Sequence, residues 1–378
     1  VSNNNLIREI PFSICNLTSI MGLSLYKNNL NETIPECIRN LSCSLLDIGL
    51  QNNNFHSQIP KNFAKRCMLK SFHTNNNKLE GSLPPLLGNC KDLNLLDVGN
   101  NNLNDTFPNW LGNLDQREVL ILRSNGFYGK VDSFDVSVSF THLRVIDLSH
   151  NNFGGYLPTL FFEHLHAIRE GYEKKVEPEY MEDAIGTVIV NYAFFLSFTA
   201  KGLGTEFQLL LSIWMVIDLS SNKFLGEIPK ILGELHLLIV LNLSHNYLSS
   251  NKLEGRIPTE LKNLGFLKVL NLSQNNLKGP IPQGKQVDTF TNDSYMGILD
   301  LCGLPLSKSY DTDEETPAKF DRDDDDGGDE LNWKFSILMG YGCGLVLGMS
   351  MAYTVFTTGK PWWLIRIVEL DRQRFAKR

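Results

Sequence analysis

The side chains that could perform catalytic or metal chemistry are scattered along this sequence, without the spacings that such chemistry needs. Seven cysteines occur without a CxxC pair, so neither a zinc ribbon nor a redox-active dithiol is indicated. The histidines are dispersed too, and the spacing of His164 and His166 is far more often incidental than metal-binding. No serine triad or carboxylate pair can be assigned. We therefore expect a protein that is not an enzyme and that needs no metal and no cofactor.

Side chains suited to non-covalent recognition recur at one place in a repeated pattern, next to an alternating pair of apolar residues. In the first part of the chain they differ from repeat to repeat, and they include Tyr26, Lys27, His73 and Arg123. Later they become uniform and read DLS or NLS. Variation indicates a ligand surface, although exposed positions also vary without a ligand. Uniformity indicates structure or a common partner.

The pattern is clearest in LKVLNLSQNNLKGPIP, residues 267–282, whose spacing of leucines, one asparagine and a closing proline fits the chain nine times. The closing prolines before residue 158 are 24 or 25 residues apart, a period within the leucine-rich-repeat range. A single coil of this size cannot bury its leucines alone, so neighbouring coils must stack. We expect an α/β solenoid of about nine repeats and a partial one.

Each repeat predicts a short strand with one buried face, from apolar pairs such as Leu23 and Leu25. The asparagine that follows, such as Asn151, is expected between coils, where its amide can donate to and accept from backbone groups that have lost water. We interpret these asparagines as scaffold. The residues between and after the apolar pair face the concave surface, where a partner binds.

Residues 169–211 interrupt the repeat and form an island between two parts of the array. Its apolar part, TVIVNYAFFLSFTAKG, contains no clean run long enough to span a bilayer and predicts buried strands. Long insertions in a solenoid are often binding elements, so Tyr172, Tyr180 and Lys201 are candidate contacts. The alternative is a passive spacer.

A second irregularity follows the island, where the step from Pro229 to Pro258 is 29 residues. Two asparagine frames, Asn246 and Asn251, lie only five residues apart. We interpret this stretch as two repeats collapsed into one, which predicts a local bulge or a weaker stack.

The net charge of −7 is concentrated in residues 311–330, which hold eleven acidic residues against two basic ones. The remainder shows no basic footprint for nucleic acid. Such a like-charge block favours an extended, solvated spacer. Residues 335–356 follow without a single charge, and these 22 residues are long enough to span a bilayer as a helix.

The flanks of this span predict its orientation, because the preceding segment is acidic and the following one is basic. The C-terminus is therefore expected in the cytosol and the array outside the cell. Gly340, Gly344 and Gly348 form one small-residue stripe that lets another helix approach closely. Ordinary membrane glycine is the alternative.

Sequons agree with an extracellular array, although an asparagine-rich repeat also produces them by chance. Asn242 and Asn271 lie in strands and rank below the others. Cys67 and Cys90 occupy nearly equivalent points of adjacent coils, which allows either a disulfide or two buried thiols. The favoured glycosylation sites are Asn16, Asn31, Asn40, Asn104 and Asn292.

The closing motif LxGxIP, seen in LEGSLP, FLGEIP and LKGPIP, together with MGYGCGLVLGMSM and TGKPWWL, resembles the plant leucine-rich-repeat receptor-like proteins of the tomato Cf disease-resistance class. The resemblance covers nearly the whole chain and implies a second short strand per coil and a twisted solenoid. Residues 284–310 resemble the C-terminal cap of that family, in which a second cysteine follows LCGLPL. Tyr310 stands there in this chain, so Cys302 lacks the partner that the family provides.

The resemblance implies a single-pass plasma-membrane glycoprotein of plant defence that perceives a pathogen-derived peptide or protein. It would pair with an adaptor receptor-like kinase through the glycine stripe and recruit a co-receptor kinase through the last repeats. The tail after the span has no room for a kinase fold of its own. Two alternatives stay open: a developmental receptor-like protein that binds an endogenous peptide, and a truncated non-functional or decoy fragment.

The chain opens in mid-repeat without an initiator methionine, and we interpret it as the C-terminal portion of a longer protein. We divide it into leucine-rich repeats (1–168 and 212–283), an island (169–211), a cap (284–310), an acidic juxtamembrane spacer (311–332), a transmembrane helix (333–357) and a short cytosolic tail (358–378).

Overall fold

The computed structural model of the protein describes residues 2–114, 116–131, 140–170, 196–200, 203–207, 214–246 and 252–306. The predicted spacer, transmembrane helix with its glycine stripe, and cytosolic tail lie outside these residues. Tyr172, Tyr180 and Lys201 of the island lie outside them as well. Within the described ranges no helix is long and apolar enough to cross a membrane.

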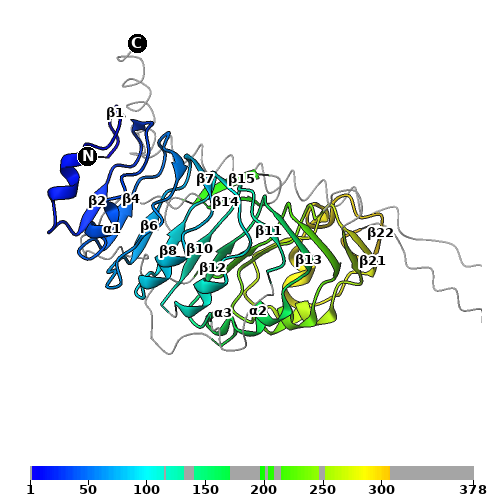
Figure 1. The fold of residues 1–378 in the computed structure, drawn as a ribbon. Coiled ribbons are helices and arrows are strands. Elements are labelled where there is room, and N and C mark those ends of the chain that lie inside the picture. The colour runs from blue at the N-terminus through cyan, green and yellow to red at the C-terminus, as the bar shows by residue number, and fades with distance from the viewer. Residues whose placement is uncertain are drawn as a thin grey trace, which may run out of the picture. The chain divides into compact units, whose positions relative to one another are not determined.

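One three-residue strand from each coil joins a parallel sheet whose strands follow chain order (Figure 1). The sheet confirms the predicted leucine-rich-repeat array. Among the described residues it has nine strands: β2 (Gly22–Ser24), β4 (Asp47–Gly49), β6 (Ser71–His73), β8 (Leu95–Asp97), β10 (Val119–Ile121), β12 (Val145–Asp147), β16 (Val216–Asp218), β18 (Val240–Asn242) and β20 (Val269–Asn271).

The leucine spacing explains which face of this sheet is buried. The middle residue of each strand and, except at Thr74, the residue after the strand lie in the main hydrophobic core, as Ile146 and Leu148 do. Because side chains alternate along a strand, the first and third residues point to the opposite face. A solenoid of this kind turns that face inward, and we call it the concave face.

Short parallel strands on a second side of the coils confirm the extra strand that the LxGxIP closure implies. The glycine of this motif has a left-handed backbone, as at Gly155 with φ 83°. A Cβ there would lie 3.1 Å from the Lys130 Cγ of the preceding coil, so glycine also permits close stacking. The sheets are β1 (Ile7–Arg8) with β3 (Asn29–Leu30); β5 (His56–Gln58), β7 (Lys78–Gly81) and β9 (Asn102–Leu103); and β11 (Tyr128–Gly129), β13 (Asn152–Tyr156), β17 (Lys223–Glu227), β19 (Leu253–Gly255), β21 (Asn276–Pro280) and β22 (Asp300–Cys302).

Single helical turns complete most coils after the closing proline, where the fixed φ of proline suits the start of a turn. They bury leucines such as Leu232 and Leu261 against the core. The 3₁₀ turns are η1 (Phe12–Asn16), η2 (Pro85–Asn89), η3 (Asn109–Asn113), η4 (Lys230–Glu234), η5 (Thr259–Asn263), η6 (Lys285–Thr289) and η7 (Asn292–Tyr295), and the α-helical turns are α1 (Ile38–Leu41), α2 (Thr159–Glu163) and α3 (His166–Arg169).

The framework asparagines form a hydrogen-bonded ladder between coils, which confirms their interpretation as scaffold. Asn53 donates from Nδ2 to the carbonyl of Leu25 in the preceding coil at 3.0 Å. Its Oδ1 accepts the N–H of Leu30, also in the preceding coil, at 3.1 Å. The same amide bonds the carbonyls of Leu50 and Gln51 in its own coil.

The island leaves the main sheet continuous. Strand β12 pairs directly with β16, with Val145 opposite Val216, although the island separates them in sequence. Asn222 donates to the carbonyl of Leu148 at 2.9 Å and so continues the ladder across the gap. Within the island the backbone of β14 (Leu196–Ala200) pairs antiparallel with that of β15 (Leu203–Phe207). Strands were predicted for this apolar stretch.

Two disulfides join adjacent coils at the start of the array. Cys67 and Cys90 are bonded, with their Cα atoms 4.5 Å apart, which resolves the two alternatives left by the sequence. Cys15 and Cys37 form a second bond that we did not predict. Their sequence separation of 22 is close to one repeat and could have indicated that they lie on adjacent coils. Of the described cysteines outside these bonds, Cys43 is exposed and Cys302 is buried.

The cap closes the last coil through backbone hydrogen bonds. The N–H groups of Leu272 and Gln274 donate to the carbonyls of Ser294 and Met296, each at 2.8 Å. Strand β22 then adds to β21, with Gly279 opposite Leu301. The edge of the main sheet is thereby covered by the cap, which protects it from pairing with another chain.

Candidate ligand-binding groove

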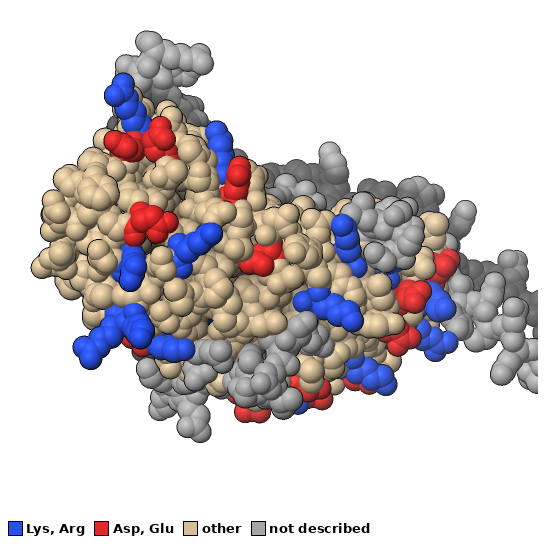
Figure 2. All heavy atoms as spheres, viewed as in Figure 1, with Lys and Arg blue, Asp and Glu red and all other residues tan. Residues whose placement is uncertain are grey.

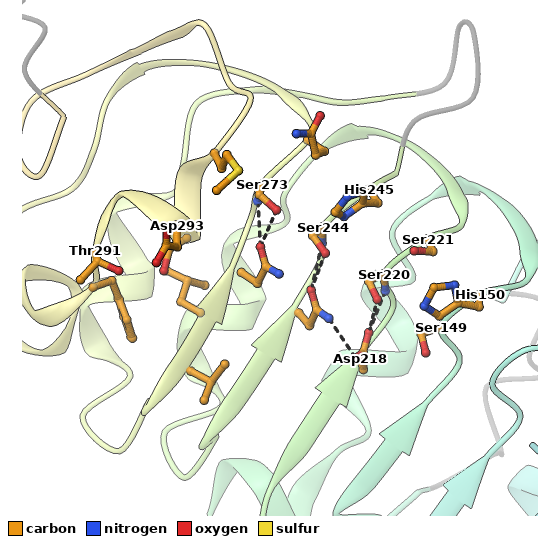
Figure 3. Close-up of a pocket in the computed structure, with 18 of the residues that line it drawn as sticks. Ser149, His150, Asp218, Ser220, Ser221, Ser244, His245, Ser273, Thr291 and Asp293 are labelled. Atoms are coloured by element: carbon orange, nitrogen blue, oxygen red, sulfur yellow. Dashed lines mark hydrogen bonds between the residues drawn. The ribbon is translucent and has the colours of Figure 1, made fainter. Parts of the chain in front are cut away.

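A groove runs along the concave face of the last coils, from Arg123, which follows β10, to the cap (Figure 3). Five coils and the cap contribute side chains to it, the first of them through Arg123, and most of these side chains are polar. The labelled residues in the view are Ser149, His150, Asp218, Ser220, Ser221, Ser244, His245, Ser273, Thr291 and Asp293.

Each of the last four coils places an aspartate or asparagine at the third strand residue and a serine two residues later. In the coil of Asp218, the N–H and the hydroxyl of Ser220 both donate to the aspartate Oδ1, at 2.9 and 2.6 Å. Ser273 bonds Asn271 in the same way, at 3.1 and 2.7 Å. Since each hydroxyl proton is used, the serine oxygens can only accept further hydrogen bonds. The serines are themselves only 3–6% exposed, so they form the polar floor of the groove and offer little surface to a ligand.

The carboxyl groups at one end of the groove are linked along the array. Asn242 donates from Nδ2 to Oδ2 of Asp218 at 2.9 Å. On the other side Asp147 lies opposite Asp218 in the sheet register, and the Nη1 of Arg123 is 3.8 Å from Oδ2 of Asp147. Burial raises the pKa of Asp218 to about 7, and repulsion from Asp147 adds to the shift.

The outer rim of the groove is a row of four residues, one per coil, all with a left-handed backbone. They are His150, Ser221, His245 and Gln274, with φ of 53°, 52°, 55° and 57°. The two histidines and the glutamine are exposed. Partial burial of the His150 ring, and after it the nearby Arg123, lowers its pKa below the usual value. Rim side chains in adjacent coils are spaced by about one strand separation, about 4.8 Å.

The arrangement favours binding over nucleophilic catalysis. A catalytic serine needs a base that takes its proton, but in the coils of Ser244 and Ser273 the hydroxyl donates to an asparagine amide, which cannot act as a base. The groove instead presents serine acceptors, an asparagine row and a mixed set of charges, including Lys268 and Asp293. This chemistry fits a polar, extended ligand that lies across several coils.

Comparisons with known proteins agree with this geometry. A family profile described as Leucine Rich Repeat matches residues 92–114, 142–163, 215–235 and 266–284. Receptor-like protein 9DC3 of Solanum pimpinellifolium is 44% identical over 60% of this chain and 28% of its own length. Receptor-like protein 33 of Arabidopsis thaliana is 35% identical over the whole of this chain and 44% of its own length. A Receptor-like protein Cf-9 homolog of Solanum lycopersicum is 42% identical over 60% of this chain and 29% of its length.

The chain is a leucine-rich-repeat protein of the plant receptor-like type. It spans between 24% and 44% of the length of the receptor-like proteins that it matches. Among solved structures, the ectodomain of the Arabidopsis thaliana receptor kinase GASSHO1/SCHENGEN3, in complex with CASPARIAN STRIP INTEGRITY FACTOR 2, is 26% identical with a TM-score of 0.59. The similarity covers 82% of this chain and 33% of that one. These similarities indicate no enzyme family.

In this receptor-like protein, only Arg123 of the described candidate residues lines the groove. Tyr26 is half-buried and Lys27 is exposed, and both lie in the first complete coil, far along the array from the groove. His73 is only 4% exposed, and burial lowers the pKa of its ring to about 3, so it is neutral and offers little surface to a ligand. The structure therefore does not gather the predicted residues into one site.

The groove residues that sequence reasoning missed are those of the uniform repeats. Their DLS and NLS motifs were interpreted as structure or as contacts to a common partner, and the hydrogen bonds between aspartate or asparagine and serine show the structural part of that role. The residue after each serine could have indicated the groove from the sequence. At this position His150, His245 and Gln274 have a left-handed backbone and line the rim.

The favoured sequon asparagines of this receptor-like protein are all exposed, which leaves their glycosylation a prediction: Asn16, Asn31, Asn40, Asn104 and Asn292. Asn242 and Asn271 are half-buried and each accepts two hydrogen bonds from a serine, in keeping with their lower rank. On the face shown in Figure 2, Lys and Arg side chains alternate with Asp and Glu instead of gathering into one patch.

Proposed function

We propose that this chain belongs to a cell-surface receptor-like protein that recognises a pathogen-derived peptide or protein and signals in plant defence through partner receptor kinases. The observation that carries the proposal is a polar groove across five coils in a chain homologous to Cf-9-type receptor-like proteins. The kinase ectodomain that resembles it was solved with a bound factor, which supports a ligand-binding role for a leucine-rich-repeat array of this kind.

In this proposal the ligand lies across the strands and uses the groove in layers. It lies over a floor of buried serines such as Ser244, which is only 3% exposed and whose hydroxyl donates to Asn242. The rim residues His245 and Gln274 add contacts that depend on the ligand's side chains. Exposed Met296 at the cap end supplies an adaptable apolar contact.

The transmembrane part of the proposal rests on residues outside the described ranges. The stripe of Gly340, Gly344 and Gly348 would pair with the helix of an adaptor receptor-like kinase, since small residues let two helices approach closely. A co-receptor kinase would join at the last repeats and the cap. Replacing Gly344 with isoleucine is expected to weaken co-precipitation of the adaptor kinase, and unchanged co-precipitation would count against the pairing.

The experiment that tests the function is recovery of partners from plant membranes before and after treatment with pathogen extract. We expect an adaptor kinase in both samples and a co-receptor kinase only after treatment. His245→Ala should reduce the treatment-dependent signal, whereas the matched control His236→Ala, an exposed histidine outside the groove, should not.

Three outcomes would overturn the proposal in different ways. Recruitment by extract of uninfected plants alone would favour a developmental receptor that binds an endogenous peptide. Failure of the chain to reach the plasma membrane would favour the non-functional fragment. An equal loss of recruitment in the His245 and His236 variants would remove the groove as the ligand site.

A further inference from the structure

The asparagine ladder is uniform through most of the array. Each framework asparagine accepts an N–H from the preceding coil and donates to a carbonyl of that coil. For Asn151 the two distances are 3.0 Å to Phe127 N and 3.0 Å to Leu122 O. For Asn101 they are also 3.0 Å each, to Leu79 N and Thr74 O.

The ladder weakens over the last two framework asparagines. Asn246 lies 3.4 Å from Phe224 N and 3.5 Å from Leu219 O, at the limit of a hydrogen bond. Asn275 keeps its donor bond, 2.9 Å to Leu243 O. Its Oδ1 is buried and has no hydrogen-bond partner within the described part of the chain.

The spacing of the sequence explains the lost acceptor bond. Elsewhere the N–H donor lies two positions after the framework asparagine of its own coil, and it donates to the framework asparagine of the next coil. Phe224, for example, lies two positions after Asn222 and donates to Asn246. In the second sheet, the glycine of one coil pairs with the apolar donor residue of the next coil: Gly155 pairs with Phe224, and Gly226 pairs with Leu253. Leu253 thus holds the equivalent place, but it lies seven residues after Asn246 instead of two.

Other contacts between the coil of β18 and the coil of β20 remain intact, and we call this interface the boundary. Strand β18 pairs with β20 in register, with Leu241 opposite Leu270. On the helical side the coils are in close contact, because a Cβ at Gly233 would clash with the carbonyl oxygen of Glu260. Lys230 Nζ is 3.3 Å from Oε1 of Glu260. The boundary is therefore tightly packed on the helical side and under-bonded at the asparagine turn.

We propose that this boundary is a joint, at which residues 252–306 open as a unit from residues 2–246 before the rest of the array unfolds. In a repeat array, stability is close to a sum over neighbouring coils, so one weak interface divides the cooperative unit. A buried acceptor without a donor weakens that interface selectively. The groove crosses the joint, because His245 precedes it and Gln274 follows it.

Native-state hydrogen exchange on the full chain in detergent tests the joint. The N–H of Ser221 bonds Ser244 before the boundary, and that of His245 bonds Ser273 across it. We expect a step in exchange rate of at least about tenfold between these two amides. A gradual rise toward the end of the array would indicate ordinary fraying and would overturn the proposal.

Two variants test the cause. Deletion of residues 247–251 returns the spacing of the closing prolines to 24 residues and places Leu253 two positions after Asn246. The step should then disappear. The same five residues inserted after Asn101 of the deletion variant should create a new step there.

Persistence of the step after the deletion would overturn the proposal, as would an insertion that creates no step. If the deletion variant does not fold, the insertion into the unaltered chain still decides, because a second step after Asn101 is expected only when spacing controls the ladder.

Discussion

The side-chain amide of Asn151 donates a 3.0 Å hydrogen bond to the carbonyl oxygen of Leu122, which lies 29 residues earlier in the preceding coil. The Oδ1 of the same side chain accepts the N–H of Phe127 from that coil. One buried asparagine thus satisfies a donor and an acceptor on either side of a turn. It also bonds the carbonyls of Leu148 and Ser149 in its own coil, each at 3.1 Å.

Replacing Asn151 with alanine should lower the free energy of unfolding by about 2–4 kcal/mol, because Leu122 O and Phe127 N lose their partner where water cannot reach them easily. Urea unfolding of the full chain in detergent measures the change. Asn104→Ala is the control, since that side chain is exposed and its loss should matter by less than about 0.5 kcal/mol. Equal effects of the two variants would contradict a structural role for the ladder.

Arg117 offers the opposite kind of variant, one that should stabilise the protein. It occupies the core position that Leu93 and Leu143 hold in the neighbouring coils, and it is only 1% exposed. Nη1 donates to Leu111 O at 2.9 Å, but Nε and Nη2 have no partner among the described residues. Burial accordingly lowers the pKa of the guanidinium to about 9.

Arg117→Met keeps an unbranched side chain and removes the buried charge, so we expect a gain of about 1–4 kcal/mol in unfolding free energy. Denaturant midpoints of the two chains provide the measurement. Arg256→Met is the matched control at an exposed arginine and should be nearly neutral. A loss of stability in the Arg117 variant would mean that the guanidinium has a favourable partner in the folded chain.

Thr74 is a milder case of the same kind. It fills the second core position of its coil, which is Leu50 and Val98 on either side, and its Oγ1 is buried without a hydrogen-bond partner among the described atoms. Thr74→Val has nearly the same shape and should stabilise the fold by about 1 kcal/mol. Thermal unfolding would reveal this as a higher Tm, with exposed Thr291→Val as the neutral control. A lower Tm for the Thr74 variant would contradict the prediction.

The strands, the stacking order and the asparagine ladder could be predicted from the sequence because they follow from one repeated spacing. Leu23 and Leu25 can be buried on one face only if the residues are extended, and the same spacing places Asn28 at the turn. The departures from the repeat were visible too, but their consequences were not. Arg117 stands at a leucine position in the sequence, yet only the structure shows that its charge stays buried.

The groove could not be predicted because its position depends on how neighbouring coils and the cap combine. We expected contacts where residues vary, such as His73, but that ring is buried. The groove instead lies over the uniform coils, where the cap adds Thr291 and Met296 to the rim of His245 and Gln274. Periodicity reports the contacts within a coil, whereas a groove across several coils needs their mutual placement.

The buried carboxyl group of Asp218 predicts a pH dependence of stability with a definite sign. Its pKa rises from 3.8 to about 7 on folding, through burial first and repulsion from Asp147 second. Between these two values the folded state binds more protons than the unfolded state, so the unfolding free energy falls as the pH rises. The stabilisation is complete below about pH 3.8 and is lost as the pH passes about 7.

Asp218→Asn should flatten this slope, because asparagine does not titrate and already occupies the equivalent place in the next two coils, at Asn242 and Asn271. Unfolding free energies measured at about pH 4, 5.5, 7 and 8 give the slope of stability against pH for each chain. Part of the dependence should remain, since burial also raises the pKa of Asp97 to about 7. Asp300→Asn, at an exposed carboxylate, is the control and should leave the slope unchanged. An Asp218 variant with the slope of the unaltered chain would mean that this carboxyl group is solvated in the folded protein.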